Sequence, residues 1–185
     1  MSILIIGFGV LLLMLGVIVY VAISKYSLIG NLIVTSKDFL NNGFLDSKFT
    51  CDGLNLIPEI EIKNLPVNTK SLAIIIEDPD APKSTWVHFI AWNIKIESIK
   101  DVILFKDNIE EINGLIRGIN SANELSWHGP CPPKGHGVHI YYFKVYALNK
   151  EKINLKEGSN KEDFLEEIKG IDLSYGELIG KYKRD

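Results

Sequence analysis

The stretch SLAIIIEDPDAPKSTWVHFIAWNI, residues 71–94, holds two strand-forming segments separated by a proline-rich loop. Its first seven residues form a short apolar run, which stops at Asp78-Pro79-Asp80 as a strand buried on both faces of a sheet would. Trp86 to Ile94 is rich in aromatic and β-branched residues, which favour strands. The stretch therefore predicts two strands of a buried sheet.

The rest of the chain adds more strand than helix. His139 to Leu148 (HIYYFKVYAL) has a strong excess of strand formers and predicts a third strand. Asn160 is positioned to cap a helix over Lys161 to Lys169, and Leu173 to Leu178 is expected to form a second short helical turn. Ile96 to Gly114 has no decisive period and is expected to be mostly loop. The predicted domain is mainly β with one or two peripheral helices.

The first residues pose a separate question. Ile3 to Ile23 carries no charge over twenty-one residues, and a helix of that length spans about 31 Å, close to one hydrocarbon core. We expect a retained single-pass transmembrane anchor over residues 1–24, a short linker over 25–31 and one domain over 32–185. A signal peptide cleaved near Ser24 is the alternative, although no basic residue precedes Ile3. The side of the membrane that holds the domain stays open.

The composition excludes several classes of function. The net charge is −3 and there is no long basic run, which argues against nucleic acid as a partner. There is no Cys-x-x-Cys or His-Glu-x-x-His pattern, so neither a zinc site nor another cofactor is expected. The two cysteines, Cys51 and Cys131, form one bridge only if the fold brings them together, which the sequence leaves undecided.

Two proline loops carry the candidate chemistry. In EDPDAPKSTWVHF, residues 77–89, prolines restrict the backbone around Asp78 at the end of one predicted strand, and His88 lies inside the next. A carboxylate that faces a histidine favours the protonated imidazole, which can donate to an oxyanion. Taken on its own, Asp-Pro-Asp is better explained as an ordinary turn.

The second loop, HGPCPPKGHGVH at residues 128–139, holds three of the four histidines. Glycines such as Gly135 permit positive φ and offer backbone donors, and His139 shares a strand face with Tyr141. His128 and His136 are expected only to flank the site, and His88 is expected to be the partner of Asp78. We favour an anion-binding site over a hydrolase that uses this Asp–His pair, because no nucleophile motif is present.

These motifs, in this order, resemble the phosphatidylethanolamine-binding protein family, specifically its bacterial and archaeal Raf-kinase-inhibitor-like branch. The matching segments cover nearly all of the predicted domain. They are FTCDGLNLIPEI (49–60), LPVNTKSLAIIIEDPDAP (65–82), WVHFIAWNI (86–94), GIN (118–120), GPCPPKGHGVHIYYFKVYAL (129–148) and ELIGKYKR (177–184).

The resemblance implies a large central sheet packed on a smaller one, with helices near the C-terminus and a small anion-binding cavity at the surface. The ligand-binding residues that it implies are Asp78, Asp80, Pro82, His88, Pro132, Gly135, His139 and Tyr141. It implies a binding module for a small phosphorylated or anionic ligand rather than an enzyme. The alternative is an inhibitor of a serine protease or kinase that docks through an exposed loop such as 95–114.

The chain departs from the family pattern at two positions. Ile140 stands where the family usually has an arginine, which puts ligand affinity or local hydrogen bonding in doubt. Lys83 stands where a small residue is common and adds a positive charge near the rim of the expected cavity.

Overall fold

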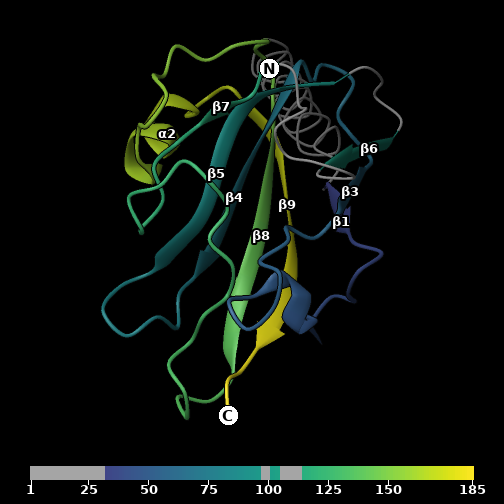
Figure 1. Cartoon of the computed structure of the whole chain (residues 1–185). Coiled ribbons are helices and arrows are strands. Elements are labelled where there is room, and N and C mark those ends of the chain that lie inside the picture. Colours follow the sequence, from purple (N-terminus) through teal and green to yellow (C-terminus); the bar gives the residue numbers. More distant parts are fainter. Residues whose placement is uncertain (1–31, 97–100, 105–113) are drawn as a thin grey trace, which may run out of the picture. The chain divides into compact units, whose positions relative to one another are not determined.

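The large sheet has six strands and forms the centre of the domain (Figure 1). The computed structural model describes residues 32–96, 101–104 and 114–185. The strand order is β2-β9-β8-β4-β5-β7, antiparallel except for the parallel pair β2 and β9. The strands are β2 (Gly43–Phe44), β4 (Ser71–Asp78), β5 (Trp86–Lys95), β7 (Ile116–Arg117), β8 (His139–Leu148) and β9 (Asp172–Tyr182). The three strands predicted from sequence are confirmed and lie side by side in it.

A smaller antiparallel sheet of three strands packs against the large one. Its order is β1-β3-β6, with β1 at Ile33–Thr35, β3 at Ile60–Lys63 and β6 at Asp101–Leu104. A 3-10 turn, η1 (Ser47–Phe49), and one helix, α2 (Lys161–Glu167), complete the described elements. The predicted arrangement of a large sheet on a smaller one is confirmed.

The apolar run in β4 is explained by the two layers that cover the large sheet. Ile74 and Ile76 pack in the cluster that contains the smaller sheet, whereas Ala73 and Ile75 pack in the cluster that contains α2. All eight residues of β4 are buried. A strand covered on both faces needs apolar side chains at every position rather than at every second one.

Helix α2 begins where the sequence predicts. The side chain of Asn160 accepts from the backbone N–H of Asp163 at 2.8 Å and so caps the first turn. Phe164 is fully buried and its ring stacks on that of Trp92, which fastens the helix to the sheet. The helix is two residues shorter than predicted and ends before Ile168.

Two segments differ from the sequence prediction. Leu173 to Leu178, expected as a helical turn, lies within β9, because Ser174 to Leu178 pair with β8 from Ala147 back to Phe143. Buried and exposed positions alternate along this part of β9, which is a strand period. The segment 96–114, expected as mostly loop, contains β6, which completes the smaller sheet through its pairing with β3. In both segments, pairing with a strand that is distant in the sequence determines the secondary structure.

The predicted transmembrane helix needs a correction. No helix within residues 32–96, 101–104 and 114–185 is long and apolar enough to cross a membrane. The described helix, α2, is seven residues long, about 10 Å, and five of the seven are charged. The segments predicted as an anchor (1–24) and a linker (25–31) lie outside the described residues. Over the part of the chain that the structure describes, the fold class is therefore a mainly β domain with one helix, and the single-pass membrane localisation is withdrawn with the transmembrane helix.

Candidate ligand-binding pocket

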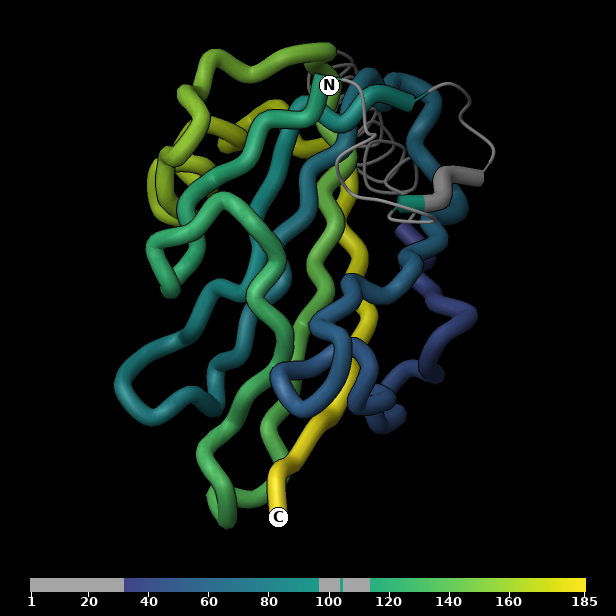
Figure 2. The backbone as a smooth tube through the Cα atoms, viewed as in Figure 1, coloured from purple at the N-terminus to yellow at the C-terminus, as the bar shows by residue number. Residues whose placement is uncertain are grey.

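The two proline loops meet at one end of the large sheet and enclose a pocket of about 310 Å³. The loop after β4, the start of β5 and the start of β8 all lie at the end of the sheet where the chain terminates (Figure 2). The pocket is lined by Asp78, Ala81, Pro82, Trp86, His88, His128, Cys131, Pro132, Pro133 and His139. Segments about fifty residues apart thus form one site.

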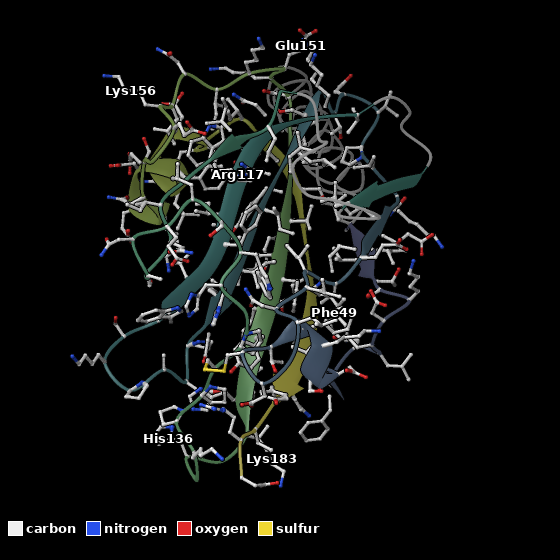
Figure 3. The ribbon with its side chains drawn as sticks, in the orientation of Figure 1. Phe49, Arg117, His136, Glu151, Lys156 and Lys183 are labelled. Atoms are coloured by element: carbon white, nitrogen blue, oxygen red, sulfur yellow. A yellow bond between two sulfur atoms is a disulfide. The ribbon has the colours of Figure 1, made fainter. Side chains whose placement is uncertain are left out.

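A disulfide between Cys51 and Cys131 fastens the second proline loop to the chain around η1. The two Cα atoms are 5.4 Å apart, and the bridge joins residues separated by 80 positions. It is the yellow bond in Figure 3. Backbone hydrogen bonds reinforce it: Cys51 N–H donates to the carbonyl of Pro130 at 3.1 Å, and Gly129 N–H donates to Asn55 Oδ1 at 2.8 Å. The question left open by the sequence is answered, because the cysteines are paired.

The C-terminal residues hold the far part of the same loop. Gly135 N–H donates to the carbonyl of Arg184 at 3.1 Å. The Arg184 guanidinium in turn donates to the Asp52 carboxylate, and this bond, together with one from the Tyr182 hydroxyl, lowers the pKa of Asp52. The backbone donor of Gly135 is therefore committed within the protein, and Gly135 is not among the lining residues.

Asp78 and His139 form a buried pair at the pocket wall. His139 Nδ1 lies 2.7 Å from Asp78 Oδ2, and the residues are 2 % and 3 % exposed. The other carboxylate oxygen of Asp78 accepts from the backbone N–H of Asp80 at 2.8 Å. On the opposite side, His139 Nε2 lies 2.8 Å from His136 Nδ1. The hydrogen-bonding atoms of both buried side chains are thus engaged.

Asp80 does not line the pocket and instead accepts a hydrogen bond from the start of β8. Its Oδ2 accepts from the backbone N–H of Ile140 at 2.9 Å, which ties the first proline loop to the start of β8. This bond uses the main chain, so it does not depend on the side chain at position 140. The doubt about local strand-edge bonding raised by Ile140 is thereby answered.

His88 is not the partner of Asp78, contrary to the sequence prediction. It lies in a bulge of β5, since Ile76 pairs with Phe89 and the next residue, Glu77, pairs with Val87. Bulges redirect a side chain relative to the regular strand. His88 Nδ1 lies 2.5 Å from the backbone carbonyl of His128 and must carry the proton of that bond, because a carbonyl only accepts.

The other nitrogen of His88, Nε2, has no hydrogen-bond partner among the described residues. Burial lowers the pKa of His88 to about 4, and the side chain is therefore neutral near pH 7. With Nδ1 protonated, Nε2 of the neutral ring offers a lone pair. A neutral His88 differs from the protonated imidazole, donating to an oxyanion, that the sequence analysis expects.

Tyr141 lies directly beneath His88 in the core. Their rings meet edge to face with centroids 5.3 Å apart, and the buried hydroxyl of Tyr141 has no partner in the described part of the chain. Burial, followed by the nearby Asp78 carboxylate, raises the pKa of Tyr141. Tyr141 is not among the lining residues, so it supports His88 from behind.

Five of the eight predicted site residues line the pocket: Asp78, Pro82, His88, Pro132 and His139. Asp80, Gly135 and Tyr141 contact or support that group without lining it. The structure adds four residues that the sequence analysis did not name as site residues: Ala81, Trp86, Cys131 and Pro133. It also places His128, expected only to flank the site, in the lining. Trp86 precedes His88 by two positions, and the two-residue period of a strand was the available signal. Lys83 is exposed and outside the lining.

The chemistry of the pocket follows from this inventory. Prolines, a tryptophan and an alanine form most of the wall, and three polar side chains from neighbouring strands converge on it: Asp78, His88 and His139. No Lys or Arg is among these lining residues. Within the described residues there is no group of three or more side chains that could hold a metal ion. The pocket is therefore suited to a small organic ligand with both apolar and polar parts.

A mainly β domain with such a pocket defines a small-ligand-binding protein, and sequence comparison identifies its class. The chain belongs to the phosphatidylethanolamine-binding protein family, which it matches over residues 35–183. The resemblance inferred from the proline loops is thereby confirmed.

Relatives and solved structures agree. A UPF0098 protein of Pyrococcus horikoshii is 43% identical over 150 residues, which cover 80% of this chain and 75% of that protein. The crystal structure of Escherichia coli YbcL, described as a member of the mammalian PEBP family, aligns with a TM-score of 0.75 and 28% identity over 84% of this chain and 100% of that one. A putative PEBP homologue from Chlamydia trachomatis gives a TM-score of 0.73 with 31% identity, covering 84% and 99%.

Proposed function

We propose that this protein is a binding module for a small phosphorylated or otherwise anionic ligand of the size of a phospholipid headgroup. The observation that carries the proposal is the convergence of Asp78, His88 and His139 on a pocket whose wall is formed mostly by prolines, a tryptophan and an alanine. A volume of about 310 Å³ is at the lower end of small-molecule sites, which suits a headgroup rather than a whole lipid. Since no Lys or Arg lines the pocket, we expect micromolar to millimolar affinity.

The proposed role is binding rather than catalysis. The atoms of Asp78 and His139 that a general base would use are engaged with Asp80 and His136. His88 keeps a lone pair, but the lining contains no hydroxyl or free thiol for it to activate, because Cys131 is in the disulfide. These contacts favour an arrangement that holds a ligand without attacking it.

The test is calorimetric titration of the full chain with O-phosphoethanolamine, alongside tryptophan fluorescence. We expect saturable heat and a fluorescence change, because Trp86 lines the pocket. The matched variant is Trp86→Phe, which should retain most of the heat and lose most of the fluorescence change; Trp92→Phe, buried against α2, should keep both. The absence of heat with O-phosphoethanolamine at millimolar concentration would refute the proposal.

An inhibitory role toward a serine protease or kinase stays a prediction from the family resemblance. The segment expected to dock, 95–114, is described only at 95–96, 101–104 and 114. A carboxypeptidase Y inhibitor solved with its proteinase has a TM-score of 0.54 at 15% identity over 85% of this chain and 84% of that one, a likeness of fold alone. Unchanged protease and kinase rates at a large excess of the protein would exclude this alternative.

A further inference from the structure

Among the buried polar side chains of the pocket, hydrogen bonding leaves one kind of group for a ligand; His128, which also lines the pocket, is partly exposed and lies near Glu124. Asp78 uses one oxygen for Asp80 N–H and the other for His139. Both nitrogens of His139 are engaged, by Asp78 and His136. Of the three converging side chains, only His88 has an atom without a partner, Nε2. Because Nδ1 donates to the carbonyl of His128, that atom is an acceptor.

The surroundings of His88 oppose a positive charge on its ring rather than supporting one. From β8 it is faced by His139 and by the Tyr141 ring, and from the second proline loop by His128. The carboxylate that lines the pocket, Asp78 on β4, is already paired with His139. His88 itself is 4 % exposed. A bare dianion placed against Nε2 would meet a lone pair, without a lysine or arginine in the lining to compensate.

A phosphate monoester can resolve this mismatch, because it has a proton to donate. Its second pKa is about 6, so slightly below neutral pH a large fraction carries one P–OH group. A sulfate ester of the same shape has no such proton at these pH values and can only accept hydrogen bonds. A buried polar atom left without a partner is costly, about 1–3 kcal/mol, and this cost discriminates between the two esters.

We propose that the pocket binds the singly protonated form of a phosphate monoester, whose P–OH donates a hydrogen bond to Nε2 of His88. The inference rests on the function proposed above and narrows its ligand class. The ligand's own proton, rather than a charged histidine, then provides the recognition, and phosphodiesters and sulfate esters are selected against.

The experiment compares O-phosphoethanolamine with O-sulfoethanolamine by calorimetry on the full chain between pH 5.5 and 8. At pH 5.5 both ligands are mostly zwitterions with one negative charge on the ester, so they differ chiefly in the P–OH group. We expect the phosphate ester to bind at least tenfold more tightly at pH 5.5. Its affinity should fall about tenfold per pH unit well above the ligand's second pKa, while the sulfate ester stays weak throughout.

Each result decides between the hypotheses. Equal affinities for the two esters at pH 5.5, or affinities that rise together as the pH falls, would overturn the proton-donor inference while leaving the anion-binding function in place. Binding of neither ester at any pH would instead remove the proposed function. The wild-type comparison alone yields these outcomes, so they do not depend on the folding of a variant.

His88→Asn supplies the matched variant. The asparagine amide can replace Nδ1 as the donor to the carbonyl of His128, but its side chain is too short to offer an acceptor where Nε2 lies. We expect the preference for the phosphate ester to shrink to within about twofold, with the sulfate ester little affected. A variant that keeps the full preference for the phosphate ester would show that His88 is not the group that accepts the hydrogen bond from the P–OH.

Discussion

His139 and His88 line the same pocket and are buried to the same degree, but their hydrogen bonding differs. His139, on β8, has a partner for each ring nitrogen, and Asp78 holds it from the neighbouring strand β4. His88, in the bulge of β5, has a partner for Nδ1 alone. Native proteins satisfy nearly all of their buried polar atoms, so an unsatisfied one needs an explanation.

The two histidines have different roles: His139 helps to hold the fold together, and His88 is available to bind the ligand. The Asp78–His139 pair connects two adjacent strands and the first proline loop, and its loss would disturb the walls of the pocket. The His88 side depends on one carbonyl from the second proline loop, which the disulfide fastens. We therefore expect changes to the Asp78–His139 pair to reduce the stability of the fold, and changes to the His88 side chain itself to act first on ligand binding and pH response.

The largest expected effect comes from the disulfide. Replacing both Cys51 and Cys131 by serine should lower the free energy of unfolding by roughly 4 kcal/mol, because the bridge closes a loop of 80 residues in the unfolded chain. Urea denaturation followed by tryptophan fluorescence measures the loss. The native chain treated with a thiol reductant is the control and should lose a similar amount.

The same variant also tests the contrast between the two histidines. In NMR spectra the imidazole signals of His88 should shift, because the loop that supplies the His128 carbonyl is released, while those of His139 should change less. A variant as stable as the native chain, or one with unchanged His88 signals, would show that the bridge does not hold this side of the pocket.

The next effect tests the His139 side alone. Asp78→Ala removes the buried partner of His139 and the acceptor of the Asp80 N–H, and should lower the free energy of unfolding by about 3 kcal/mol. The same urea titration measures it. Glu151→Ala, an exposed position just past the end of β8 that lies away from the pocket (Figure 3), is the control and should change the value by about 0.5 kcal/mol or less. A loss that small in Asp78→Ala would mean that the pair is not part of the scaffold.

Local patterns made the strands and the helix cap predictable. The unbroken apolar run of β4 required burial on both faces, and the smaller sheet and α2 provide it. Asn160 followed by acidic residues predicted the start of α2. The proline loops predicted most of the pocket, since prolines and the adjacent Asp78 and His139 lie where strands end.

Register and long-range pairing were not predictable in this way. The partner of Asp78 depends on the β5 bulge, which turns His88 toward the carbonyl of His128 and leaves His139 for the carboxylate. No residue in WVHFIAWNI marks that bulge. From the sequence, His88 on β5 and His139 on β8 are equally suitable partners for Asp78, because both strands pair with β4. The assignment of Leu173–Leu178 failed for a related reason, because β8 converts a weakly patterned segment into strand.

The smallest expected effect concerns the pH dependence of stability. The pKa of His88 is lowered from 6.5 to about 4 on folding, so between these values the unfolded chain binds a proton at this site that the folded protein does not. The His88 contribution to the free energy of unfolding should therefore fall as the pH falls, by about 1.4 kcal/mol per pH unit. The useful window is pH 4.5 to 6.5, because carboxylates with lowered pKa values, such as Asp52 and Glu61, begin to lose their contributions below it.

Urea titrations of the native chain and of His88→Asn across this window isolate that contribution. The variant has no titrating group at position 88, so its stability should vary less steeply, and the difference in slope is the share due to His88. If the free energy of unfolding varied with pH equally steeply in the native chain and in His88→Asn, His88 would have the same pKa in the folded and unfolded states. It would then not be the buried neutral acceptor on which the contrast with His139 depends. Addition of O-phosphoethanolamine at pH 5.5 sharpens the measurement, because a ligand that donates to Nε2 should stabilise the native chain more than the variant.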